Sequence, residues 1–178
     1  MASSLIHMAI ANEVNKSIKY DNNKLLIGSI APDISKLIWE NKIKSHFLDS
    51  LENNVPNINS FLKKYKDKMN DDFVMGYFIH LYTDYLWFKY FIPEFYSEPM
   101  IMKLDGSVVK CNGNMLSLYI YNDYTNLNIQ LLDEYNLNLK IFYNKIPDMK
   151  NIIEEIPMEK LYLIINKCSE VIINTKKN

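Results

Sequence analysis

The chain has only three histidines, His7, His46 and His80, and each lies among apolar neighbours. Asp84 follows His80 at a spacing of four, which places both side chains on one face of a helix. Asp33 follows a proline between the first two histidines. Imidazole and carboxylate groups are ligands for divalent transition metals, and a bound metal with an open position can activate water for hydrolysis. These five residues therefore predict a metal centre gathered from separate segments.

Each of these residues, taken singly, also fits an ordinary structural role. A histidine and an aspartate at spacing four often form a buried pair without a metal, and Asp33 can cap the helix that follows it. Separate structural roles explain the three histidines less well as a set. Incidental histidines would also occur in the polar loops, and none of the three does. Buried histidines need partners, and one cation can serve several of them.

Helices must position these residues. Glycine is scarce, with four residues, and apolar residues recur at spacings of three and four. This pattern predicts an all-α, multi-helix bundle in a single domain over residues 1–178. Ser3 or Ser4 is expected to cap a first helix that carries His7 and ends at about Lys19. The apolar stripe of this helix consists of Ile6, Ile10, Val14 and Ile18.

A long central helix, expected over residues 72–91, carries the pair His80 and Asp84. Asp71 is expected to cap this helix and Pro93 to end it. The helix is apolar enough to span a bilayer, but its ionisable side chains are expensive in lipid. The sequence therefore favours a buried core helix.

A second helix is expected over residues 23–29, just before Asp33. Pro32 is expected to move Ala31 out of helical geometry and so to place Asp33 on a turn. His46 follows in a segment of loop and short helices. The remaining expected elements are a helix capped by Asn59 or Ser60 and ending near Lys68, a hairpin pairing residues 100–103 with 107–110 within the loop 96–114, and helices over 115–135, 139–144, 148–156 and 158–175.

Composition narrows the function classes. The formal net charge is -1 and every cationic side chain other than histidine is lysine, so a basic surface for nucleic acid is not expected. Cys111 and Cys168 lack CxxC partners, which argues against a cysteine zinc site or a disulfide framework. The chain also lacks a His-Asp dipeptide, an HExxH motif and an ExxH motif. Because no basic region precedes an apolar run at the N-terminus, we expect a cytoplasmic protein without a transmembrane segment.

The order of the four segments resembles the zinc-dependent phospholipase C family, which shares an all-helical superfamily with the single-strand-specific zinc nucleases. The resemblance covers about residues 3–92. The matching segments are Ser-Leu-Ile-His7, Gly-Ser-Ile-Ala-Pro-Asp33, Lys-Ser-His46-Phe and Gly-Tyr-Phe-Ile-His80-Leu-Tyr-Thr-Asp84.

The resemblance implies a set of ligands and a reaction. Asp33, His46, His80 and Asp84 would bind one zinc, His7 would bind a second, and Asp84 would bridge the two. Asp33 would also serve as a general base. Two neighbouring cations lower the pKa of a water molecule and hold a phosphate oxygen, which suits hydrolysis of a small phosphate ester or a phospholipid headgroup. The same ligand types also suit Fe, Mn or Ni.

The chain departs from the family at two places. Secreted members complete the second site with the amino group and carbonyl of an N-terminal tryptophan, whereas this sequence reads Met1-Ala2. The family's third zinc uses two histidines and a glutamate after the long helix, and no histidine follows His80 here. Asp123 is a candidate replacement ligand, with Glu134 as a second candidate; a cap or a hydrogen-bond partner is the alternative role for Asp123.

Two functions remain open on the sequence. The first is a metal-dependent hydrolase, specifically a phosphoesterase. The second is a non-catalytic helical protein with a structural or sensory metal, because the first ligand group already supplies the four ligands that close a structural zinc site. An open coordination position that faces a solvent-reachable pocket would distinguish the catalytic site.

Overall fold

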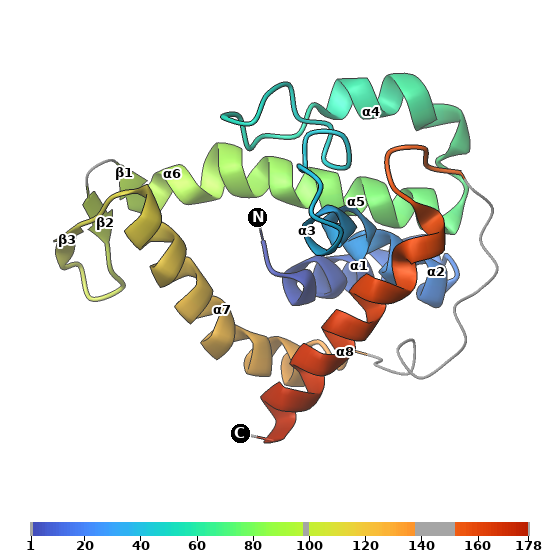
Figure 1. Cartoon of the computed structure of the whole chain (residues 1–178). Helices are drawn as coiled ribbons and strands as arrows, with labels where there is room; N and C mark the ends of the chain where they lie inside the picture. The colour runs from blue at the N-terminus through green and yellow to red at the C-terminus, as the bar shows by residue number, and fades with distance from the viewer. Residues whose placement is uncertain (1, 98–99, 138–151, 178) are drawn as a thin grey trace.

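The computed structural model describes residues 2–97, 100–137 and 152–177. These residues are mostly helical, which confirms the all-α class, and they include one small antiparallel sheet with the strand order β1-β2-β3 (Figure 1). The α-helices are α1 (Ser4–Ile18), α2 (Asn22–Ile30), α3 (Ile34–Leu37), α4 (Ile58–Tyr65), α5 (Asp72–Leu86), α6 (Ile92–Phe95), α7 (Gly113–Glu134) and α8 (Leu161–Lys177). The strands are β1 (Tyr96–Ser97), β2 (Met100–Met102) and β3 (Val108–Lys110).

Helix α5 runs through the middle of the molecule and contacts α1, α2 and α4 (Figure 1). Asp71 caps it by accepting hydrogen bonds from the backbone N–H groups of Phe73 and Val74, as the sequence predicts. The small sheet lies beyond the far end of α5, and α7 begins there and returns to contact α1 and α8. Within the described ranges, no helix combines the length and the apolar character needed to cross a membrane.

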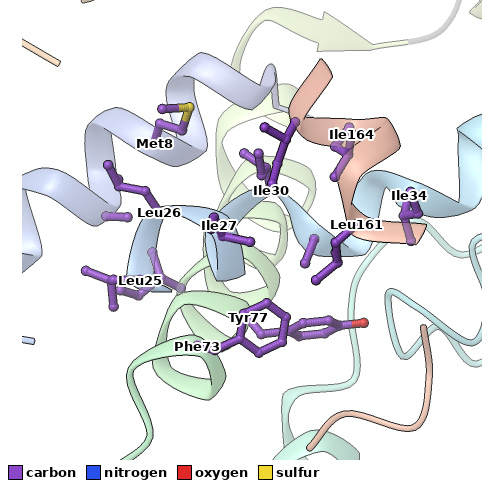
Figure 2. Packing of buried hydrophobic residues seen from close by; sticks show 14 of the residues in the cluster. Met8, Leu25, Leu26, Ile27, Ile30, Ile34, Phe73, Tyr77, Leu161 and Ile164 are labelled. Atoms are coloured by element: carbon purple, nitrogen blue, oxygen red, sulfur yellow. The ribbon is translucent and has the colours of Figure 1, made fainter. Parts of the chain in front are cut away.

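The core is built around α2, whose apolar side chains are buried on several sides (Figure 2). Burying one such side chain stabilises the fold by about 1.5–3 kcal/mol. Helix α8 packs on α3 and on the short turn that follows α2, although more than a hundred residues separate them in the sequence. The residues that meet in this part of the core are Met8 of α1, Leu25, Leu26, Ile27 and Ile30 of α2, Phe73 and Tyr77 of α5, and Leu161 and Ile164 of α8.

Two glycines allow α2 and α5 to cross at close range. A Cβ atom on Gly28 would lie 2.3 Å from the carbonyl oxygen of Phe73, and one on Gly76 would lie 2.1 Å from the carbonyl oxygen of Leu25. Both contacts are to backbone, which cannot move aside without separating the helices. The crossing therefore requires glycine at both positions, and Gly76 lies one turn before His80.

Helix α2 continues past the expected break at Pro32. Ala31 has helical dihedral angles (φ -59°, ψ -38°) and begins a 3-10 turn, Ala31–Asp33, that leads directly into α3. The expectation that Pro32 would move Ala31 out of helical geometry is therefore wrong. Asp33 ends a short helical turn and is buried.

Pro93 does not end the central helix. After α5 the chain forms a π-helical segment, Trp87–Phe91, and then α6, in which Pro93 occupies one of the first two positions. Proline is tolerated there because the first N–H groups of a helical turn have no partner within that turn. The helical path therefore extends to Phe95, about one turn further than the sequence predicts.

The first helix begins where the sequence predicts, with Ser3 accepting a hydrogen bond from the backbone N–H of Ile6. Its expected apolar stripe is buried only in part. Ile10 and Val14 are each 37% exposed, and they line an apolar groove together with residues of α5 and the π-helical segment.

The C-terminal half matches the predictions in part. The expected hairpin is confirmed, because β2 and β3 pair antiparallel. Helix α8 confirms the helix expected over 158–175. The helix expected over 139–144 lies outside the described residues. Residues 152–156, the described part of the helix expected over 148–156, are not helical.

Substituting Gly76→Ala is expected to lower the free energy of unfolding by about 1–3 kcal/mol, because the added methyl group overlaps the backbone of α2. Urea denaturation followed by circular dichroism measures the change. The exposed α7 substitution Asn122→Ala is the control, and its effect should stay within about 0.5 kcal/mol. Equal stability of the Gly76→Ala variant and the parent protein would contradict the tight crossing.

Candidate metal centre

The structure brings together the five residues predicted to bind metal. His7 comes from α1, Asp33 from the turn after α2, His46 from the segment after α3, and His80 and Asp84 from α5. All five side chains are buried, and none is more than 4% exposed.

The orientation of His80 is fixed by α2. Its Nδ1 atom lies 2.7 Å from the carbonyl oxygen of Ser29. A carbonyl oxygen only accepts, so Nδ1 carries the proton and Nε2 presents a lone pair to the centre. This bond depends on the glycine crossing, because Ser29 follows Gly28 and His80 lies one turn after Gly76.

His46 is held in the same way by its neighbour. The hydroxyl oxygen of Ser45 lies 2.9 Å from Nδ1 of His46 and 3.5 Å from the carbonyl oxygen of Lys42. A hydroxyl that donates to Lys42 accepts from Nδ1–H, which leaves Nε2 of His46 as the free acceptor. The buried Tyr77 hydroxyl donates to the carbonyl oxygen of Ser45 and ties this segment to α5.

Four acceptor atoms therefore face one another. The Nε2 atoms of His46 and His80 are 3.2 Å apart. Oδ1 of Asp33 lies 3.6 Å from Nε2 of His46, and Oδ2 of Asp84 lies 3.6 Å from Nε2 of His80 and 3.9 Å from Nε2 of His46. Tetrahedral zinc ligands at about 2.0–2.1 Å from the ion are about 3.3 Å from one another. Asp33, His46 and His80 thus form one group able to hold an ion, and Oδ2 of Asp84 lies beside both imidazole nitrogens of this group.

Asp84 also faces a second group of possible ligands. Its Oδ1 atom lies 3.5 Å from Nε2 of His7, and the ring of His7 stacks on that of His80 with 3.8 Å between centroids. His7, His80 and Asp84 together form a group able to hold an ion. The backbone N–H of Ala2 donates to the same Oδ1 at 3.1 Å. Asp84 thus offers one oxygen to each group, as a bridging carboxylate would.

Several of these buried atoms lack ordinary partners among the described residues. Both ring nitrogens of His7, Oδ2 of Asp84 and Oδ1 of Asp33 have no hydrogen bond there, although the ammonium group of Lys36 forms an ion pair with Oδ1 of Asp33 at 3.0 Å. Leaving one buried polar atom unsatisfied costs about 1–3 kcal/mol. Cations at the two groups would pair with the two carboxylate oxygens and with one ring nitrogen of His7.

Protonation also favours metal binding. Burial alone would raise the pKa of Asp33, but Lys36 and the neighbouring imidazoles hold it well below its usual value. Burial likewise opposes ionisation of Asp84, and His7 and His80 hold the pKa of its carboxyl below the usual value. Burial, together with His7, lowers the pKa of His80 well below its usual range. Ionised carboxylates and neutral imidazoles are the forms that bind metals.

The structure does not bring Asp123 to the centre. Asp123 and Glu134 are exposed on α7, and neither belongs to the two ligand groups found among the described residues. Tyr124, the next residue after Asp123, is buried instead and packs with Ala2 and Ile6. The face of α7 that turns toward the centre is therefore the face of Tyr124.

A pocket of about 280 Å³ lies beside the centre, and Asp33 is the one candidate ligand among the described residues that line it. Asp33 and Ala2 line it together with residues of α1, α3, α7 and α8. Such an opening allows a small molecule to reach a bound ion, as a catalytic site requires.

Sequence reasoning missed the residues that shape this pocket. Lys36 could have been found, because it follows Asp33 by one helical turn and its ammonium group can reach that carboxylate. The row Tyr121, Tyr124 and Asn128 also has helical spacing, but nothing in the sequence shows which face of α7 turns inward.

Comparison with known proteins adds no family assignment: no family model, curated protein or solved structure matches the chain.

We expect the metal-free protein to bind zinc and to be stabilised by it, by about 2.7 kcal/mol at a free zinc concentration one hundred times the dissociation constant. His80→Ala should abolish binding of the first ion, because Nε2 of His80 is one of its ligands, and should weaken the second, because the ring of His7 stacks on that of His80. His7→Ala should remove only the second ion. Calorimetric titration and metal analysis of the purified protein measure both effects.

The control for these variants is Asp123→Asn, which removes an exposed carboxylate outside both groups. It should bind as much zinc as the parent protein. Unchanged zinc content in the His80→Ala variant would contradict the metal centre.

Proposed function

We propose that the protein is a metal-dependent hydrolase of phosphate esters. The observation that carries the proposal is a cluster of buried polar atoms without hydrogen bonds, one of whose residues, Asp33, also lines a pocket. A metal-free core would avoid such a cluster, and a purely structural ion would not need the pocket. The same features would suit Fe, Mn or Ni as well as zinc.

Each ligand would have a defined place. Asp33, His46, His80 and Asp84 would hold the first ion, and His7 would join Asp84 at the second. Ions bound there would supply Lewis acidity, which lowers the pKa of a water molecule and stabilises charge on a phosphate oxygen. The Ala2 N–H competes for Oδ1 of Asp84, so we expect the second ion to bind more weakly than the first.

Asp33 is the residue proposed to act on the nucleophile. It borders the pocket, and its Oδ2 atom accepts a hydrogen bond from the Ser4 hydroxyl at 3.4 Å. Asp33 is ionised, and its Oδ2 atom is the oxygen that could accept a proton from water while Oδ1 faces the other candidate ligands. Positioned proton transfer of this kind typically contributes about 10²–10⁴-fold in rate.

We also propose that the chain is a reduced relative of the zinc-dependent phospholipase C family. The support is that the four segments on which the resemblance depends meet at one centre, with the carboxylate of Asp84 between two groups of ligands. The exposed position of Asp123 supports a centre without a third ion of the family type.

The second candidate function is a structural or sensory metal site. One observation favours it: Asp33, His46 and His80 form one group and Asp84 lies beside both of its histidines, so four side chains could close a tetrahedral zinc site. A protein of this kind would bind zinc and gain stability but would not turn over phosphate esters.

Zinc-loaded protein is expected to hydrolyse p-nitrophenyl phosphate, to lose this activity on chelation and to regain it with zinc. Asp33→Asn should lower kcat by about 100-fold or more, since an amide cannot accept the proton. Asp123→Asn, the matched carboxylate control, should keep full activity. Zinc content is measured in parallel, and a fully loaded parent protein without turnover would favour the structural role.

A further inference from the structure

The walls of the pocket carry more positive than negative charge. Lys36 from α3 and Lys167 from α8 both line it. Asp33 is the only carboxylate among the described residues of its wall, and the proposed function assigns Asp33 to the metal. The pocket therefore offers no carboxylate of its own to a cationic headgroup.

Lys36 forms an ion pair with Oδ1 of Asp33, the oxygen proposed to bind a metal. Its ammonium group lies 3.0 Å from Oδ1 of Asp33, and the same oxygen lies 3.6 Å from Nε2 of His46. An ion bound among these ligands competes with Lys36 for that oxygen. The partly exposed ammonium group would then be available to an anion in the pocket.

Lys167 is also available to a ligand. Its ammonium group pairs with Glu170 at 2.9 Å, but both side chains are more than half exposed. Exposed ion pairs of this kind contribute little to stability, so Lys167 can exchange this partner for a ligand oxygen. Lys167 forms its ion pair with Glu170, which is not one of the five candidate ligands, so its substitution leaves those ligands in place.

The rest of the wall suits a small neutral group. Helix α7 contributes Tyr121, Tyr124, Thr125 and Asn128, which combine aromatic rings with uncharged polar groups. The volume of about 280 Å³ lies just below the range typical of drug-sized ligands, so the pocket fits a small molecule better than a long acyl chain.

We infer that this pocket takes a phosphomonoester dianion with a small, neutral leaving group, and that it selects against phosphodiesters with a quaternary ammonium headgroup. The inference rests on the proposed function for the position of the metal. A phosphomonoester carries close to two negative charges at neutral pH, whereas a diester carries one. The positive charges of Lys36 and Lys167 match the second negative charge, which only the phosphomonoester carries.

The test compares p-nitrophenyl phosphate with p-nitrophenyl phosphorylcholine on the zinc-loaded full chain, and measures the binding of inorganic phosphate by calorimetry. The monoester should have the higher kcat/KM by about tenfold or more, the effect of one charge-assisted hydrogen bond. Lys167→Met should raise KM for the monoester and weaken phosphate binding, each by about tenfold, and change kcat/KM for the choline ester less than twofold. Lys103→Met, on the exposed hairpin, is the control and should change neither.

The outcomes separate this inference from the proposed function. Equal or faster turnover of the choline ester, with no effect of Lys167→Met, would overturn the inference and keep the hydrolase. If the protein turns over neither ester, the proposed hydrolase function is wrong. The binding of inorganic phosphate then tests whether the pocket takes a dianion. Binding weakened by Lys167→Met upholds a dianion pocket, and binding that Lys167→Met leaves unchanged overturns it.

Discussion

The close crossing of α2 and α5 is the constraint on which the centre depends. Gly28 and Gly76 bring the two backbones together, and a methyl group at either position would overlap a carbonyl oxygen. This approach puts the carbonyl of Ser29 within 2.7 Å of His80 and places Asp33, at the end of the turn after α2, beside the central helix. Because one helix orients a candidate ligand of the other, the candidate metal centre and the core share the same contact. Damage to the core would therefore change the chemistry as well.

A buried cluster of acceptors is costly unless something positive joins it. The Nε2 atoms of His46 and His80 face each other at 3.2 Å, and each ring has its Nδ1 atom within hydrogen-bond distance of an oxygen. Helices, core packing and the ion pair between Lys36 and Asp33 hold this arrangement. The packing of the rest of the fold thus holds the candidate ligands in place at a cost in stability, and metal binding would offset that cost. The same preorganisation serves a catalytic ion and a structural one, so the pocket beside Asp33 is what favours catalysis.

The sequence was sufficient to predict most helices, because caps and helical periodicity are local signals, and the candidate ligands that it singled out lie together in the structure. Ser3 and Asp71 cap their helices as predicted, and His80 and Asp84 share a helix face. Features decided by distant packing could not be predicted. Whether Pro93 ends a helix or begins another turn depends on the path of the whole chain. The inward face of α7 is set by contacts with the N-terminal residues, so Asp123 remains outside the site. Lys167 lines the same pocket as Asp33, but it lies on α8, and no local sequence signal shows that α8 packs there.

The most direct test is the position of zinc in crystals of the zinc-loaded protein, located by anomalous diffraction at the zinc edge. The account predicts a strong peak at about 2.0–2.2 Å from the Nε2 atoms of His46 and His80 and from carboxylate oxygens of Asp33 and Asp84. A weaker second peak is expected beside His7. A single peak at a surface site, or ligation through the Nδ1 atom of either His46 or His80, would contradict the centre described.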